Sequence, residues 1–192
     1  MAKKLASTLP NMILSLTFIA MVMSAALTFV YLKTRGPIEE AAKNKEVNAI
    51  KQVSPVFDND PTVEARTFDG LTLYPVKSQN ESLGYAVKTY TEKGFAGHIE
   101  LMAGFRNDGS IVNITVLDHK ETPGLGTKMT ESKFINQFIG KNPGSFMLKV
   151  KKDGGQVDAI TAATISSRAF CDALQRAYEG LNKVNDSLKV QP

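Results

Sequence analysis

The sequence is poor in the residues from which many catalytic and metal sites are built. It contains one cysteine, Cys171, and two histidines, His98 and His119, among 192 residues. One cysteine excludes an internal disulfide, a zinc cluster and an iron–sulfur site held by this chain alone. The two histidines lack a clustered set of partners, so we predict no metal site and no Ser/His/Asp arrangement. We therefore expect neither catalytic nor metal-binding residues in this chain.

Patterns that bind nucleotides and nucleic acids are missing as well. Neither a Walker loop nor a dinucleotide-binding glycine fingerprint is present. The net charge is only +4, and no basic run is interleaved with aromatic residues, so we expect no nucleic-acid partner. The single cysteine falls inside a helical pattern beside its apolar face, which indicates a small core residue.

One long apolar run is present, near the N-terminus. Residues 12–32 are almost wholly apolar, and about twenty such residues in a helix span the hydrocarbon core of a bilayer. A cleaved signal peptide is the alternative, because Lys3 and Lys4 precede the run and residues 24–26 are small. The length of the run favours a retained helix. We assign residues 1–35 to a transmembrane helix with short flanks, in contact with lipid.

A connector is predicted between this helix and the rest of the chain. Gly36 and Pro37 are expected to end the membrane helix. Residues 38–53 then show the pattern of a charged amphipathic helix that lies on the globular domain. Residues 54–61 are rich in turn formers and are predicted to be a loop. Residues 36–61 thus form an amphipathic connector, and residues 62–192 the globular domain.

The globular domain has the pattern of an antiparallel α+β fold. Asn107-Asp108-Gly109 predicts a hairpin between two alternating runs, and residues 153–155 predict a second. A short helix is expected at 132–139 and a long one from about Ile165 to Val184. Strands are predicted at 71–75, 83–91, 98–105, 111–119, 146–150 and 156–160. We predict a mostly antiparallel sheet with flanking helices, preceded by one N-terminal transmembrane helix.

Hydroxyl groups are concentrated just before the long C-terminal helix. The stretch Asp158-Ala159-Ile160-Thr161-Ala162-Ala163-Thr164-Ile165-Ser166-Ser167 begins with a carboxylate, has small residues in the middle and ends in hydroxyls. A helix N-terminus offers unpaired N–H groups and the positive end of the helix dipole, which together favour a phosphate. The alternative is that Thr161 or Ser166 merely caps the helix.

A second notable stretch is His119-Lys120-Glu121-Thr122-Pro123-Gly124-Leu125-Gly126. Pro-Gly-Leu-Gly after a strand indicates a tight, exposed loop with bare backbone. Such a loop can bring backbone N–H groups against a planar ligand, although an ordinary turn would have the same composition.

The first of these stretches resembles the flavinylation motif of the FMN-binding domain family, Asp-x-x-Ser/Thr-Gly-Ala-Ser/Thr. Asp158, Thr161, Ala163 and Thr164 match it, while Ala162 stands where the family usually has glycine. The resemblance implies that the Thr164 hydroxyl is joined to the phosphate of FMN through a phosphoester bond. It also implies a dedicated flavin transferase, which makes the bond with FMN taken from FAD.

The second stretch resembles the His-x-Glu-Thr-Pro-Gly-Leu-Gly signature of the G subunit of Rnf complexes, and residues 94–101 are similar to a strand entry of the same family. The related C subunit of the sodium-translocating NADH:quinone reductase has a similar element. The resemblance implies that this loop lines the flavin. The cofactor-binding residues that we predict are Thr164, with covalent FMN, together with Asp158, Thr161, Ala162, Ala163, Ser166, Glu121, Thr122, Gly124, Leu125 and Gly126.

The function expected from this resemblance is a membrane-anchored flavoprotein subunit whose covalent FMN relays electrons within an ion-translocating ferredoxin:NAD oxidoreductase. Its partners would be the other membrane and peripheral Rnf subunits and the flavin transferase. Two alternatives stay open: the equivalent subunit of a quinone reductase, and a membrane-tethered module that binds an anion without a covalent bond. The resemblance implies a single pass through the bacterial inner membrane with the flavin domain on the periplasmic or outer side, whereas the count of positive residues beside the membrane helix leans the other way.

Overall fold

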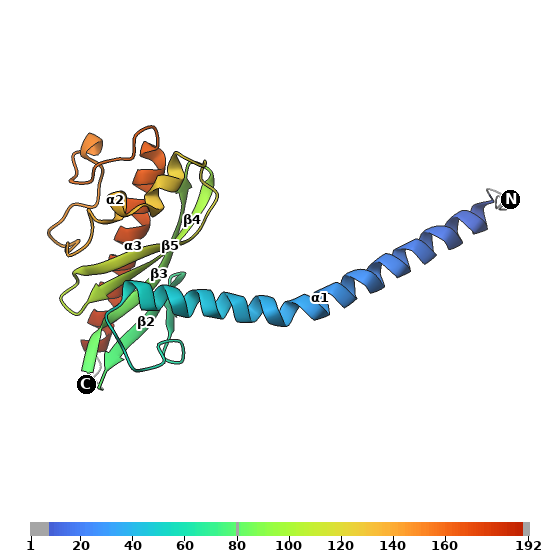
Figure 1. Ribbon diagram of the computed structural model, residues 1–192, viewed down its shortest axis with the longest axis horizontal. Coiled ribbons are helices and arrows are strands. Elements are labelled where there is room, and N and C mark those ends of the chain that lie inside the picture. The colour runs from blue at the N-terminus through green and yellow to red at the C-terminus, as the bar shows by residue number, and fades with distance from the viewer. Residues whose placement is uncertain (1–7, 80, 190–192) are drawn as a thin grey trace. The chain divides into compact units, whose positions relative to one another are not determined.

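The computed structural model describes residues 8–79 and 81–189 (Figure 1). Lys3 and Lys4, at the start of the predicted transmembrane segment, lie outside the described residues. The chain divides into two compact units, Met1–Glu46 and Val47–Pro192. The first unit is helical, and the second contains a sheet with helices on it. The boundary falls inside a helix and lies upstream of residue 62, where the sequence analysis places the start of the globular domain.

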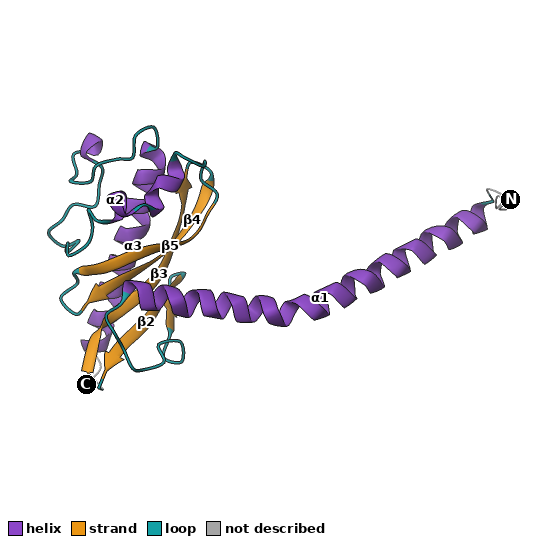
Figure 2. Cartoon of the chain, in the orientation of Figure 1, coloured by secondary structure: helices purple, strands orange, loops and turns teal. Residues whose placement is uncertain are grey.

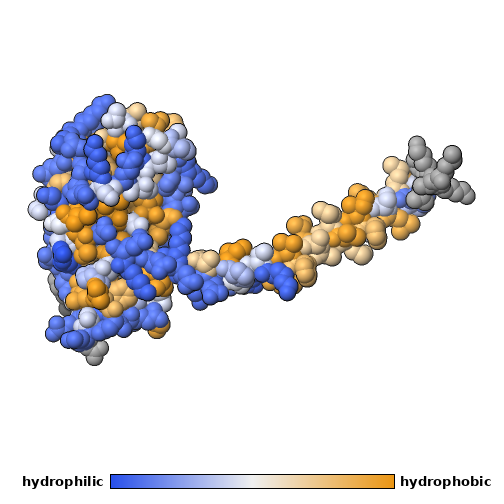
Figure 3. Space-filling view, viewed as in Figure 1, coloured by the Kyte–Doolittle hydropathy of each residue, from blue (hydrophilic) through white to orange (hydrophobic). Residues whose placement is uncertain are grey.

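The helix α1 runs without interruption from Leu9 to Val53 and contains Pro37. The prediction that Gly36 and Pro37 end the membrane helix is therefore wrong. Proline removes one intrahelical hydrogen bond, but the helix continues through Pro37. Among the described residues, α1 is the one helix long and apolar enough to cross a bilayer. Figure 3 shows the apolar surface of its N-terminal part.

Five antiparallel strands form one sheet in the order β1-β2-β3-β4-β5 (Figure 2). Neighbours in the sequence are neighbours in the sheet, because hairpin-type connections join each strand to the next. The predicted hairpin around Asn107-Asp108-Gly109 is confirmed, since it joins the last two strands. The strands are β1 (Arg66–Phe68), β2 (Leu71–Ser78), β3 (Glu81–Gly94), β4 (Gly97–Arg106) and β5 (Ile111–His119).

The predicted elements between residues 132 and 160 are only partly correct. The helix α2 covers Ser132–Ile135 rather than 132–139. The predicted hairpin of 146–150 with 156–160 is wrong: Val150 and Val157 form an isolated parallel bridge around the short 3-10 helix Lys151–Asp153. Apolar residues of this segment are nevertheless buried, because the irregular loop packs their side chains into the core.

The C-terminal helix α3 (Thr164–Lys189) covers one face of the sheet. Its apolar side chains pack with those of the strands. Phe134, Phe138 and Phe170 form an aromatic cluster in this core, with ring centroids 5.2 to 5.4 Å apart. Two strand hydroxyls also reach the helix. Thr89 donates to the carbonyl of Ala173 at 2.9 Å, and Thr91 donates to the carboxylate of Asp172 at 2.8 Å. These contacts fix the helix against β3.

The opposite face of the sheet is covered by the last turns of α1. Ala49, Ile50 and Val53 are buried there against apolar side chains of β2, β3 and β4. The Asn113 side chain of β5 donates to the carbonyl of Gln52 at 2.9 Å. The predicted placement of the connector helix on the globular domain is therefore confirmed for its final residues.

We predict that Cys171 does not react with thiol reagents while the protein is folded. Its side chain is buried in the core, and burial raises the pKa of the thiol to about 12, so the thiolate is scarce at a pH of about 8. Iodoacetamide added to the native chain in detergent should give no mass increase, whereas the same treatment in guanidinium should give complete alkylation. Rapid and complete alkylation of the native chain would contradict this placement, and C171S is the unreactive control.

Candidate functional site

A cleft of about 330 Å³ lies where three segments meet: the turn between β3 and β4, the loop after β5, and the first turn of α3. The structure thus brings together the two stretches that the sequence analysis singled out, although they are far apart in the chain. Eight of the eleven predicted cofactor-binding residues line it. The lining residues are Phe95, Glu121, Thr122, Leu125, Gly126, Ala162, Ala163, Thr164, Ile165 and Ser166.

Thr164 is the first residue of α3 and lines this cleft. The carbonyl of Ala163 accepts the first helical bond, from the N–H of Ser167 at 3.0 Å, so Ala163 occupies the N-cap position. Its methyl group offers no oxygen to the first N–H groups of the helix, which have no partner inside the helix. The site therefore combines an uncapped helix N-terminus with a threonine hydroxyl on the same turn. Such an N-terminus attracts an anion.

The segment before Thr164 is shaped by a buried hydroxyl that the sequence analysis missed. The Ser167 hydroxyl accepts a bond from the N–H of Ile160 at 2.9 Å and donates to the carbonyl of Ala163 at 3.0 Å. These two bonds hold residues 160–163 in a tight turn against the first turn of α3. Within it, Ala162 has φ +61°, the left-handed conformation that glycine adopts without strain. The one departure from the family motif thus lies at the position where the backbone favours glycine.

A buried carboxylate connects the three walls of the cleft. Glu121, 4% exposed, accepts a bond at Oε2 from the Ser166 hydroxyl (2.8 Å) and one at Oε1 from the N–H of Ala96 (3.2 Å). Gly126 makes room for it, since a Cβ there would lie 2.5 Å from Oε2. Gly94 does the same on the other side, with a Cβ 2.6 Å from Oε1. Side chains at these two positions would displace the carboxylate and separate the walls.

The loop after β5 uses much of its own backbone. The N–H of Gly124 donates to the Thr127 hydroxyl at 2.9 Å, and the N–H groups of Leu125 and Thr127 both donate to the carbonyl of Thr122, at 3.2 and 3.4 Å. These three N–H groups are thus not free for a ligand, contrary to the idea that the loop presents bare backbone. The loop instead lines the cleft with Glu121, Thr122, Leu125 and Gly126.

Three of the side chains that line the cleft are apolar and well exposed. Phe95, Leu125 and Ile165 all line it and are 68%, 41% and 46% exposed. Phe95 and Ile165 were not predicted as site residues. Ile165 lies in the first turn of α3, directly after Thr164. Phe95 lies in the stretch 94–101, which resembles a strand entry of the family, but that resemblance did not mark it as a site residue.

Three predicted residues lie outside the lining of this cleft. Asp158 and Thr161 line a neighbouring cleft of about 400 Å³. Asp158 is held there by Lys151 at 2.7 Å and by a reciprocal pair of bonds between its backbone and the Gln137 amide. Gly124 is part of the turn that shapes the loop but does not line the cleft.

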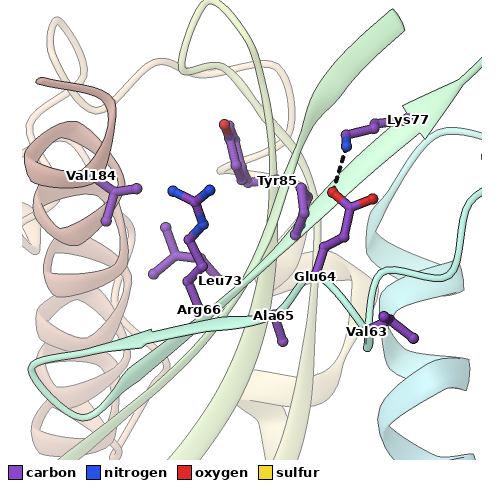
Figure 4. A pocket seen from close by; sticks show the side chains of 9 residues that line it. Val63, Glu64, Ala65, Arg66, Leu73, Lys77, Tyr85 and Val184 are labelled. Atoms are coloured by element: carbon purple, nitrogen blue, oxygen red, sulfur yellow. Dashed lines mark hydrogen bonds and ion pairs between the residues drawn. The ribbon is translucent and has the colours of Figure 1, made fainter. Parts of the chain in front are cut away.

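Other cavities and polar groups offer less for chemistry. A cleft of about 450 Å³ between the β1–β2 side of the sheet and α3 holds none of the predicted residues; an ion pair of Lys77 with Glu64 at 2.5 Å lies at its edge (Figure 4). His98 contacts Glu92 at 2.6 Å on the surface of the sheet. Within residues 8–79 and 81–189, no group of three or more His, Cys, Asp or Glu side chains could hold a metal ion.

Comparison with known proteins gives the class of this site. The model of the FMN-binding domain matches residues 94–179, which include the turn, the loop and the helix start that form the cleft. The globular unit therefore carries an FMN-binding domain.

Relatives that match nearly the whole chain then give the family. The G subunit of the ion-translocating oxidoreductase complex from Methanosarcina acetivorans is 34% identical over 176 residues, which cover 88% of this chain and 92% of the relative. The G subunit from Pasteurella multocida is 32% identical over 188 residues, with the same coverage. That from Vibrio cholerae is 29% identical over 195 residues, which cover 93% of both chains. The chain belongs to the family of G subunits of ion-translocating oxidoreductase complexes.

Two solved structures also resemble the chain. The C subunit of the Na(+)-translocating NADH-quinone reductase from Parabacteroides distasonis has a TM-score of 0.47 and 24% identity, covering 57% of this chain and 60% of its own. NqrC of Shewanella oneidensis has a TM-score of 0.46 and 19% identity, covering 69% of this chain and 70% of its own.

We predict that A162G stabilises the protein. A residue with a side chain in the left-handed conformation costs about 1–2 kcal/mol, part of which is offset because glycine makes the unfolded chain more flexible. The free energy of unfolding in detergent should rise by about 0.5–1 kcal/mol. The control is A65G, an exposed position without positive φ, which should instead lose stability. A loss of stability in A162G equal to that of A65G would show that no strain is relieved.

We predict that S166A destabilises the globular unit by about 1.5–3 kcal/mol, because the buried Glu121 carboxylate loses a hydrogen-bond donor. Urea unfolding followed by circular dichroism measures the change. The matched control is S145A, an exposed serine, which should stay within about 0.5 kcal/mol of the parent. Equal stability of the two variants would mean that the Ser166–Glu121 bond does not hold the walls together.

Proposed function

We propose that this protein is a membrane-anchored flavoprotein subunit that carries FMN on Thr164 through a phosphoester bond and relays electrons within an ion-translocating oxidoreductase complex of the Rnf type. The observation that carries the proposal is the position of Thr164, on the uncapped first turn of α3 and in the lining of the cleft. The match to the FMN-binding domain supports the choice of ligand.

The residues of the cleft suit the phosphate end of FMN. The N–H groups at the start of α3 and the positive end of its dipole stabilise the negative charge of a phosphodiester. The small side chains of Ala162 and Ala163 let the phosphate approach the backbone, and Thr164 supplies the oxygen of the ester. Attachment by the transferase forms the bond from the Thr164 oxygen to phosphorus and breaks the pyrophosphate bond of FAD, so that AMP leaves. The hydroxyl proton passes to a base of the transferase or to water.

When bound, FMN would supply the electron-accepting chemistry, and the protein would supply position and electrostatics. The bond to phosphate leaves the isoalloxazine ring unmodified while it prevents loss of the cofactor. Glu121 holds the loop and helix walls at a fixed separation, and Leu125 and Gly126 shape one side of the space between them. Asp158 and Thr161, which lie in the neighbouring cleft, would act on the acceptor segment from outside, where a transferase can reach them.

The membrane helix and the relatives indicate the setting. The apolar part of α1 anchors the chain in the bilayer, and the other membrane and peripheral subunits of the complex are the proposed partners. We place the protein in the cytoplasmic membrane with its flavin domain outside the cytoplasm, as the family resemblance implies. The lysines and arginines that flank the apolar run lean towards the opposite orientation.

Two alternative functions predict different experimental results. The equivalent role in a NADH:quinone reductase would require electron transfer to quinone in the purified complex, whereas the similarity to G subunits over nearly the whole chain favours the Rnf role. A tethered module that binds an anion without a covalent bond would release its ligand on denaturation.

We predict that the native chain, expressed in a host with the flavin transferase, is heavier than its amino acids by the mass of FMN minus one water. T164V removes the hydroxyl with little change in the size of the side chain and should abolish this increment and the fluorescent band on a denaturing gel. T164S keeps an oxygen at the same place and should retain flavin.

The matched control is T67V, which removes an exposed threonine hydroxyl on β1, outside the cleft. It should keep the covalent flavin at the level of the parent. Flavin that survives denaturation in T164V, or a native chain with no added mass, would contradict the proposed attachment.

A further inference from the structure

Phe95 has an unusual place for a large aromatic side chain. It is 68% exposed, at the turn that joins β3 to β4, and it lines the same cleft as Thr164. Most other phenylalanines of the globular unit are buried in the core, as are Phe105, Phe138 and Phe170. A single exposed phenylalanine is not unusual, but Phe95 shares the lining of one cleft with two other exposed apolar side chains, and such a group indicates a binding surface.

The backbone that carries Phe95 is held in place. Gly94 pairs with Gly97 across the turn, and the N–H of Ala96 donates to Glu121. The same carboxylate accepts a bond from the hydroxyl of Ser166 on α3. One side chain thus positions the turn that carries Phe95 relative to the first turn of α3, so the fold sets the distance between the aromatic residue and the anchor residue.

Two further exposed apolar side chains line the cleft. Leu125 comes from the loop after β5, and Ile165 follows Thr164 directly on α3. Both are about half exposed. The lining of the cleft therefore combines the uncapped helix N-terminus and the Thr164 hydroxyl with an apolar collar, by which we mean the exposed side chains of Phe95, Leu125 and Ile165. A ligand that matches this lining has both an anionic group and a largely apolar ring system.

We propose that Phe95 contacts the isoalloxazine ring of the flavin on Thr164 and, with Leu125 and Ile165, holds that ring in the collar. This inference rests on the proposed function and names the residues that place the ring rather than the phosphate. Aromatic pairs gain energy beyond the area that they bury when the rings are stacked with an offset or meet edge to face. Phe95 therefore shields part of the ring from water and fixes its orientation.

The test compares F95A with F68A in the full-length chain. Phe68 is also an exposed phenylalanine, 46% exposed, but it belongs to β1, which does not line this cleft. Both variants should carry covalent flavin by intact mass, because Thr164 is unchanged. In F95A the flavin should lose most of its protection from quenching by iodide and show a shifted visible absorption band. In F68A both properties should equal those of the parent, and F95Y should restore them.

A second measurement separates this inference from the covalent attachment. In the T164V background, free FMN is titrated while its fluorescence is followed. Loss of an aromatic contact worth about 0.5–1.5 kcal/mol should raise the dissociation constant by about 2- to 13-fold when F95A is added, whereas F68A should leave it unchanged.

The outcomes are distinct. Covalent flavin whose iodide quenching, spectrum and affinity do not respond to F95A would overturn the role of Phe95 and leave the attachment standing. A native chain without covalent flavin would overturn the attachment, and the titration of free FMN would still decide the role of Phe95. Equal effects of F95A and F68A would mean that exposed phenylalanines act through general stability, which also overturns the inference.

Discussion

The site depends on one buried carboxylate, which joins the segments that form the cleft. Glu121 accepts bonds from the hairpin turn at Ala96 and from α3 at Ser166, so a single side chain joins three segments that are far apart in the sequence. Burying a carboxylate is costly unless it is hydrogen-bonded. The two bonds offset that cost and also fix the geometry of the cleft. The glycines at 94 and 126 follow from the same requirement, because each leaves space that the carboxylate oxygens occupy.

A second constraint lies at the first turn of α3, where the N-cap residue Ala163 has no side-chain oxygen to cap the helix. A serine or aspartate at position 163 would satisfy the free N–H groups from within the chain and compete with an external anion. Alanine at this position leaves them available, and Ser167 closes the turn from inside the core instead. The hydroxyls thus have different roles: that of Ser167 holds the backbone, that of Ser166 holds the Glu121 carboxylate, and that of Thr164 lies in the lining of the cleft.

Much of the fold could be predicted because local patterns carry it. The alternation in 111–117 and the Asn-Asp-Gly turn were sufficient for the β4–β5 hairpin. The segment 146–160 misled the same reasoning, because its apolar residues are buried by an irregular loop that lacks a partner strand. Pro37 misled it as well, since the loss of one hydrogen bond at a proline did not end the helix. In the site, the motifs pointed to Thr164 and the loop. They did not show that Ser167 closes the turn before α3, which depends on how residues 160–163 fold, or that Phe95 and Ile165 come together in one cleft, which depends on the tertiary fold.

The burial of Ala49, Ile50 and Val53 against the sheet has a practical consequence for anyone who wishes to work without detergent. The sequence suggests two places to remove the membrane anchor: the Gly36-Pro37 pair, which follows the apolar run, and the loop after Val53, which follows the helix. A cut after Val53 would expose Tyr74, Val76, Ala86 and Met102 to water and turn the outer face of the sheet into a surface prone to aggregation. A water-soluble version has to begin upstream of Val47, because the end of the membrane helix is also a wall of the domain.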